Sequence, residues 1–373
     1  MKTIAVLGTL DSKGEEHAFV AGLIRERGHA ALLIDVGSGG PPVVTPDITR
    51  EEVAAAAGLD LAPLIARRDR GECVVAMSKA APVLLEKLAA AGEIDGVISL
   101  GGGGGTAIGT AAMRALPLGF PKLMVSTLAS GNTAPYLGTK DIVMMPSIAD
   151  VAGLNRLSRV IFSRAAGAIC GMVEAKVEVD AAKPLVVAAT GAGGRTMESL
   201  IESGMVSGVL DLTTTEWADE LVGGVLNAGP ERMDAAARAK VPVVIAPGCL
   251  DMVNFGEEAS VPAKFAGRNF YIHNPQVTLM RTTPVECAEL GGILAAKANA
   301  CTAGCAVMIP RQAISVISAA GQPFHDAAAD EALFGALRGH SRQPVEEFDL
   351  EINDPAFARA CAEKLLSLMA ASA

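Results

Sequence analysis

The sequence predicts an α/β fold of two Rossmann-like, doubly wound subdomains with mostly parallel sheets. Three observations predict it. Short β-branched runs alternate with Ala- and Leu-rich amphipathic stretches along the chain, as in parallel sheets covered by helices. The length of 373 residues exceeds the usual single domain of about 100–200 residues. Half of the residues are hydrophobic and only 3% are aromatic, so aliphatic side chains can fill two sizeable cores.

The first subdomain is expected to span residues 1–180. Each predicted strand is followed by a helix, and a longer helix closes the unit. The expected strands cover residues 3–7, 30–35, 96–100, 122–126 and 142–145. The expected helices cover residues 15–27, 51–57, 81–91, 106–114 and 155–173.

The second subdomain is expected to span residues 181–373 and to face a cleft shared with the first. Lys183-Pro184 interrupts the pattern, which then restarts with an apolar strand, a Gly-rich turn and a helix. The expected strands cover residues 185–189, 208–212, 241–246 and 306–309. The expected helices cover residues 196–203, 215–225, 331–338 and 355–369.

Composition and charge exclude several classes of protein. The chain has 31 Lys and Arg against 41 Asp and Glu, a net charge of −10, which argues against nucleic-acid binding and against docking on an anionic membrane. No stretch approaches the ~20 apolar residues of a membrane span. The N-terminal apolar run ends at Asp11, too early for a signal peptide. The seven cysteines are scattered, without disulfide or metal spacing. We therefore expect a cytoplasmic protein.

Five consecutive glycines, residues 101–105, follow a predicted strand and precede a helix expected to start at Thr106. Such a run permits positive φ and lets backbone N–H groups approach an anion. The N-terminus of the helix adds a partial positive charge, so a phosphate is the natural ligand. The alternative is a flexible tight turn. The expected cofactor-binding residues here are Gly102, Gly103, Gly104, Gly105 and Thr106.

A second glycine-rich turn, Gly191-Ala192-Gly193-Gly194-Arg195-Thr196, opens the second half. It nearly fits G-x-G-x-x-G, but Thr196 stands at the third glycine position, so the fingerprint is weak. Arg195 could pair bidentately with a phosphate or carboxylate. The alternative is a structural strand–helix turn. The expected anion-binding residues are Gly193, Gly194, Arg195 and Thr196.

Polar side chains also follow other strands of the first half. Ligands of doubly wound sheets bind beyond the carboxyl ends of the strands, near the switch point, where an acid can bind the ribose. The expected binding residues there are Thr9, Asp11, Ser12, Lys13 and Asp35, although Asp11 or Ser12 could merely cap the next helix. A hydroxyl-rich segment, residues 126–133, lines a pocket or completes a turn, and contributes Thr127, Ser130 and Gly131. The cations expected to meet phosphates are Lys13, Lys79 and Arg195.

The second half carries scattered polar residues that could contact a substrate. The candidate catalytic residues are Arg195, Asp251 and Arg281, and further candidate contacts are Asn254, His273 and Asn274. Each of these alone is more often a surface or structural residue. Cys249 lacks a basic partner in the sequence, so we expect an inert thiol.

Several motifs are absent. The chain has no Gly-Lys dipeptide, hence no Walker A loop, and neither a G-x-S-x-G nor an H-E-x-x-H motif. The five histidines show no ligand spacing, so no protein-held metal is expected. A Mg²⁺ ion brought in with a nucleotide needs only one or two carboxylates besides the phosphates.

Six segments, in the same order, resemble one known family. The family comprises the N-terminal ATP-binding domain of the tomato mosaic tobamovirus resistance protein and its stand-alone bacterial relatives of unassigned function. The segments are residues 101–106, 126–131, 191–196, 210–216, 250–256 and 279–283. The resemblance implies two Rossmann-like subdomains that bind ATP, with Mg²⁺, near their cleft, in a homodimer. The plant member acts by binding a viral replication protein, a role that we do not expect a bacterial chain to share.

These observations lead to three hypotheses. The first is an ATP-binding two-domain protein, whose catalytic form would transfer a phosphoryl or nucleotidyl group to a small acidic metabolite. The second is a non-catalytic nucleotide sensor or protein-partner module. The third, an NAD(P)-linked oxidoreductase, is weaker because no intact G-x-G-x-x-G is present.

Overall fold

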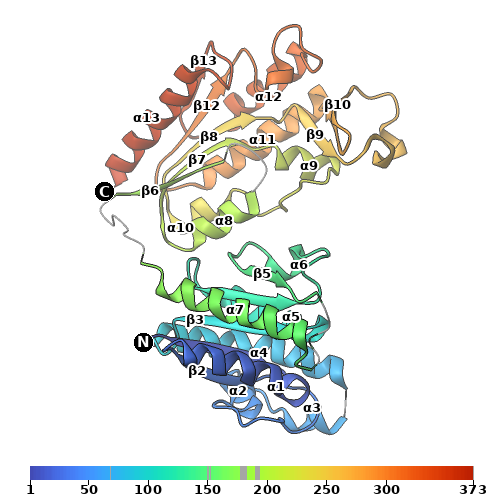
Figure 1. Cartoon of the computed structure of the whole chain (residues 1–373). Helices are drawn as coiled ribbons and strands as arrows, with labels where there is room; N and C mark the ends of the chain where they lie inside the picture. The colour runs from blue at the N-terminus through green and yellow to red at the C-terminus, as the bar shows by residue number, and fades with distance from the viewer. Residues whose placement is uncertain (68, 149–150, 152, 177–182, 190–193, 373) are drawn as a thin grey trace. The chain divides into compact units, whose positions relative to one another are not determined.

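The computed structural model describes residues 1–373 except 68, 149–150, 152, 177–182, 190–193 and 373. The chain divides into two compact units, Met1–Val179 and Asp180–Ala373, and each is described by itself (Figure 1). Each unit contains a five-stranded parallel sheet with helices packed on both faces. The predicted α/β fold with two mostly parallel sheets is therefore confirmed.

In the first unit the strands lie in the order β2-β1-β3-β4-β5. Their bounds are β1 (Thr3–Gly8), β2 (Ala30–Asp35), β3 (Gly96–Gly101), β4 (Lys122–Ser126) and β5 (Val143–Pro146). The helices are α1 (Leu10–Glu26), α2 (Arg50–Ala56), α3 (Ala62–Arg67), α4 (Arg70–Ala90), α5 (Gly103–Ala115), α6 (Ala134–Leu137) and α7 (Arg156–Glu174). Apolar residues of α2, α4 and α5 form the core on one face of the sheet, and those of α1 and α7 form it on the other. The order reverses between β1 and β3, which makes this the switch point where ligands of such sheets bind.

In the second unit the parallel strands lie in the order β13-β12-β8-β7-β6, and a small antiparallel sheet has the order β10-β11-β9. The strands are β6 (Leu185–Ala189), β7 (Val206–Thr213), β8 (Val243–Gly248), β9 (Met252–Phe255), β10 (Phe270–Asn274), β11 (Val277–Arg281), β12 (Cys305–Pro310) and β13 (Val345–Phe348). The helices are α8 (Gly194–Glu202), α9 (Glu216–Val222), α10 (Asp234–Ala239), α11 (Pro284–Ala300), α12 (Ala327–His340) and α13 (Pro355–Ser372). Helices α8 to α12 supply the core on one face of the parallel sheet, and α13 covers the other.

Several expected boundaries were wrong. Helix α4 begins at Arg70, not at 81, because the Asp69 carboxylate caps it by accepting the Glu72 N–H at 3.0 Å. Helix α5 begins at Gly103, not at Thr106, so three of the five glycines form its first turn. Helix α11 was not predicted, although Thr283 and Glu286 form a capping box at its start.

The glycine run permits close approach instead of a left-handed conformation. None of residues 101–105 has a positive φ, so the turn does not use that freedom. A Cβ built on Gly101 would lie 2.8 Å from the backbone of Gly105, whereas a Cβ on Gly103 would meet nothing within 4 Å. The chain can therefore turn from β3 directly into α5 only if Gly101 lacks a side chain.

We expect Gly101→Ala to lower the free energy of unfolding by about 1–3 kcal/mol, because a backbone atom must move to admit the methyl group. The matched control, Gly103→Ala, meets open space, and should be neutral or stabilising by about 0.5–1 kcal/mol, as expected for Gly→Ala in a helix. Urea unfolding of both variants measures the difference. Equal effects of the two substitutions would contradict this account of the turn.

Candidate functional site

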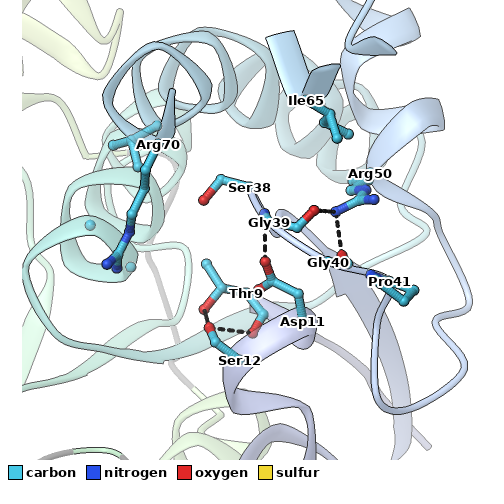
Figure 2. A pocket seen from close by; sticks show the side chains of 13 residues that line it. Thr9, Asp11, Ser12, Ser38, Gly39, Gly40, Pro41, Arg50, Ile65 and Arg70 are labelled. Carbon is cyan, nitrogen blue, oxygen red and sulfur yellow. Dashed lines mark hydrogen bonds between the residues drawn. The ribbon is translucent and has the colours of Figure 1, made fainter. Parts of the chain in front are cut away.

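A pocket of about 780 Å³ lies at the carboxyl ends of β1, β2 and β3 (Figure 2). Its walls come from the chain that follows these strands, from the starts of α2 and α4, and from α3. The lining residues are Thr9, Asp11, Ser12, Ser38, Gly39, Gly40, Pro41, Arg50, Ile65, Arg70, Val74, Gly104 and Gly105. Five of these, Thr9, Asp11, Ser12, Gly104 and Gly105, are among the residues predicted to bind a nucleotide.

The N-terminus of α5 forms one side of this pocket. Gly102 is its N-cap, without a side chain to cap the helix, and the first bond that closes on the cap is Thr106 N–H to Gly102 O at 2.8 Å. The amides of Gly103, Gly104 and Gly105 precede that bond, and such N–H groups have no partner within a helix. Together with the helix dipole they favour an anion.

Two arginines that the sequence analysis missed also line the pocket. Arg70 is exposed at the start of α4, and a Cβ built on Gly104 would lie 3.8 Å from its Nη2. Arg50, at the start of α2, is only 9% exposed. No local motif marks either residue, because both reach the pocket from helices that follow other parts of the chain.

The Asp11 carboxylate holds the loop that follows β2. Its Oδ2 accepts the Gly39 N–H at 2.6 Å, and its Oδ1 is buried without a hydrogen-bond partner among the described residues. A Cβ on Gly37 would lie 2.9 Å from that Oδ1, so the loop approaches Asp11 closely because glycine stands there. The alternative role as a cap of α1 is not seen, since neither Asp11 nor Ser12 is the N-cap and the N-cap, Thr9, makes no side-chain cap bond.

Asp35 and Lys13 do not line the pocket. Asp35 is 1% exposed, and its Oδ1 accepts the N–H groups of Leu10 at 3.0 Å and Gly37 at 2.8 Å. Burial raises the pKa of this carboxyl above its usual value, against the effect of those bonds. Lys13 directs its Nζ to the Val151 carbonyl. Asp35 and Lys13 therefore bind backbone groups beside the pocket, and their predicted contact with a ligand stays a prediction.

The remaining predicted residues of the first unit lie around or beyond the pocket. Thr106 is buried, with its Oγ1 2.7 Å from Ser126 Oγ, and Thr127 is half-buried near Gly102. Lys79 is exposed on α4, and Ser130 and Gly131 are exposed after β4. None of these lines the pocket.

In the second unit, the N-terminus of α8 already binds a carboxylate, that of Glu216. Gly194 N–H donates to Glu216 Oε1 at 2.9 Å, and Arg195 Nη2 donates to the Asn227 carbonyl at 3.1 Å. These residues line a hollow of about 450 Å³. Thr196 is exposed beside it, and Gly193 lies outside the described residues. Because Glu216 already occupies the helix N-terminus, this end of α8 is less suited to an anion than that of α5.

The other two candidate catalytic residues are buried in a polar network. Arg281 Nη2 pairs with Asp330 Oδ1 at 2.6 Å, and its Nε donates to the Phe324 carbonyl at 2.8 Å. Asp251 Oδ2 accepts the Ser315 hydroxyl at 2.7 Å, and burial raises the pKa of Asp251 to about 6. Neither residue lines the hollow that contains Arg195. The described residues therefore do not assemble the three candidates at one open site.

Further polar residues of the second unit are structural or exposed. Arg232, 1% exposed, pairs bidentately with Asp211 at 2.6 and 2.7 Å, a buried pair that the sequence analysis missed. His273 and Asn274 are exposed on β10. Burial raises the pKa of Cys249 to about 12, which keeps its thiol protonated and a poor nucleophile.

Two family models match the chain. The N-terminal domain of the uncharacterised protein family UPF0261 matches residues 2–178, and the C-terminal domain of the same family matches residues 166–369. The chain belongs to the UPF0261 family.

Relatives of this UPF0261 chain occur in bacteria and in a plant. A UPF0261 protein of Clostridium tetani is 45% identical over 99% of both chains, and one of Rhizobium meliloti is 45% identical over 96% of this chain and 97% of its own. The ToMV susceptible protein tm-1(GCR26) of Solanum lycopersicum is 34% identical over 97% of this chain, which covers 55% of the tomato protein. The resemblance to the tomato protein and its stand-alone bacterial relatives is therefore confirmed.

Within the described ranges, no group of three or more His, Cys, Asp or Glu side chains is placed to hold a metal ion. Among the described residues, no helix is long and apolar enough to cross a bilayer.

Asp219 is a buried carboxyl of the second unit whose titration can be tested by its effect on stability. It is fully buried, and its oxygens accept both the backbone N–H and the Nδ2 of Asn254 at 2.7 Å. Burial raises its pKa to about 6, so the native state keeps a proton that the unfolded chain releases near pH 4. The free energy of unfolding should therefore fall as pH rises from about 4 to about 6, by up to roughly 3 kcal/mol from this residue.

We expect Asp219→Asn to remove that part of the pH dependence, as measured by urea unfolding between pH 4 and pH 7. The control, Asp349→Asn, changes a carboxyl whose side chain is 75% exposed and should leave the pH dependence unchanged. Parallel curves for wild type and Asp219→Asn would contradict the raised pKa.

Proposed function

We propose that the N-terminal unit of this UPF0261 protein binds a nucleotide through its phosphates, with ATP as the ligand. The observation that carries the proposal is the bare N-terminus of α5, which opens into a pocket beside Arg70. Gly103 has open space where a side chain would be, so a phosphate oxygen can reach the backbone amides. An arginine beside such amides adds a charge-assisted donor with the planar geometry that suits phosphate.

The size and position of the pocket agree with this ligand. About 780 Å³ falls within the ~300–1,000 Å³ of small-molecule sites, and the pocket lies at the switch point of a parallel sheet, the usual place for nucleotides. Ile65, Val74 and Pro41 give it apolar surface on which a base can lie. The ATP assignment itself comes from the family resemblance.

The residues in the pocket also suit a Mg²⁺ ion that arrives with the nucleotide. Asp11 Oδ1 is a buried carboxylate oxygen without a partner among the described residues, and Ser12 lies beside it on the pocket wall. Mg²⁺ is commonly held by one or two carboxylates together with substrate phosphates. Asp11 and Ser12 would hold the ion, which would neutralise phosphate charge.

Binding without an assigned reaction is the function that the geometry supports best. Transfer of a phosphoryl or nucleotidyl group to a small acidic metabolite stays a prediction, because Arg195 is separate from the buried Asp251 and Arg281. The NAD(P)-linked alternative is disfavoured, because the Glu216 carboxylate caps the helix that would hold a diphosphate. The homodimer and the cytoplasmic location also stay predictions.

Isothermal titration of the full chain with ATP and Mg²⁺ tests the proposal. We expect Arg70→Gln to weaken ATP binding about 10- to 100-fold, because it removes a charge-assisted hydrogen bond worth about 1.5–3 kcal/mol. The matched control is Arg67→Gln, which removes an exposed arginine paired with Glu72 and absent from the pocket lining. Unchanged affinity in Arg70→Gln, or no ATP binding by the wild type, would overturn the proposal.

A further inference from the structure

The pocket contains a second guanidinium group, which the proposal for α5 does not use. Figure 2 shows Arg50 and Arg70 on opposite sides of Ser38 and Gly39. Arg70 lies beside the N-terminus of α5, near Gly104. Arg50 comes after the loop that follows β2. Neighbouring strands lie about 4.8 Å apart, so the ends of β2 and β3, two strands apart, are separated by roughly 10 Å.

Arg50 is built into the pocket wall. Its Nη1 donates to the carbonyls of Gly39 at 3.2 Å and Gly40 at 2.7 Å, and its Nε donates to Glu51 Oε1 at 3.1 Å. Asp11 holds the N–H of Gly39 from the other side. The guanidinium is thereby fixed at the edge of the pocket instead of moving freely in solvent.

These bonds leave part of the Arg50 guanidinium available. Its Nη2 makes no hydrogen bond to the described part of the chain, and the side chain lines the pocket. Arg50 forms an ion pair with Glu51, whose side chain is 62% exposed, and such exposed pairs are weak. A purely structural clamp on two carbonyls would need neither this free group nor a position on the pocket.

We propose that Arg50 forms a second phosphate-binding position, separate from the one at α5, so that the ligand is a nucleotide with two phosphate groups set apart. The inference rests on the proposed function, since it places the first phosphate at α5 and Arg70. A second phosphate has two sources in a nucleotide. One is the terminal phosphate of the ATP chain, and the other is a phosphate ester on the ribose, which an arginine near the end of the second strand accommodates in related sheets.

Isothermal titration of the full chain with five ligands tests the inference. The ligands are AMP, ADP, ATP, adenosine 2′,5′-bisphosphate and adenosine 3′,5′-bisphosphate. ATP and the two bisphosphates each carry two phosphate groups set apart, and we call these three the two-phosphate ligands. For the wild type, we expect at least one of them to bind tenfold or more tightly than AMP. A gain with ATP identifies the terminal phosphate as the source, and a gain with a bisphosphate identifies the ribose ester.

The Arg50→Gln variant should lose that gain while its affinity for AMP stays within about twofold of the wild type. Arg50→Lys keeps the charge without the planar fork, and should retain part of the gain. Arg70→Gln should weaken binding of all five ligands, and urea unfolding of each variant establishes that it is folded. If Arg50→Gln does not fold, the gain is compared between wild type and Arg50→Lys.

Two results would overturn the inference. One is equal affinity of the wild type for AMP and for every two-phosphate ligand. The other is an equal loss of affinity for AMP and the two-phosphate ligands in the Arg50 variants, which would make Arg50 a clamp of the loop alone. Failure of the proposed function is distinguishable, because then none of the five ligands would bind the wild type.

Discussion

The close approach of β3 and α5 is the constraint on which the candidate site depends. Gly101 ends the strand so near to Gly105 that a Cβ would lie 2.8 Å from its backbone. Without this turn, the first amides of α5 would not lie at the edge of the sheet. At Gly104, a Cβ would lie 3.4 Å from Val74 Cγ2 of α4, an ordinary contact distance, so α4 packs directly beside the first turn of α5. This packing brings a helix N-terminus and the Arg70 helix together, and that combination attracts an anion.

Close contacts at the ends of β1 and β2 stabilise the same edge of the parallel sheet. The His17 ring is buried against Gly8, where a Cβ would lie 2.0 Å from its Nε2, and Nε2 accepts the Leu100 N–H at 3.4 Å. Burial lowers the pKa of His17, which agrees with a neutral ring that accepts a hydrogen bond. Beyond β2, Asp11 accepts the Gly39 N–H and Arg50 donates to the Gly39 carbonyl, so the two side chains bind the peptide groups on either side of Gly39. In the second unit, the N-terminus of α8 instead binds a carboxylate, that of Glu216.

The parts of the fold predicted from sequence are those with a local signal. Buried β-branched runs locate most parallel strands, and the glycine run locates the turn into α5. Arg50 and Arg70 could not be predicted, because only the tertiary fold brings the starts of two other helices to this pocket. The hydrogen bonds of Asp35 could not be predicted for a related reason, since its Oδ1 binds backbone amides whose positions the sequence does not reveal. Helix α11 could have been predicted, because the capping box of Thr283 and Glu286 at its start is visible in the sequence.

The most direct test of the phosphate site is the response of its backbone amides to ligand. In the full chain labelled with ¹⁵N-glycine, the amide signals of Gly103, Gly104 and Gly105 report on the N-terminus of α5, and Gly194 reports on the corresponding end of α8. The account predicts that ATP shifts the three α5 signals, that adenosine without phosphate does not, and that Gly194 stays unchanged. Shifts confined to Gly194, or unchanged α5 signals at saturating ATP, would contradict it.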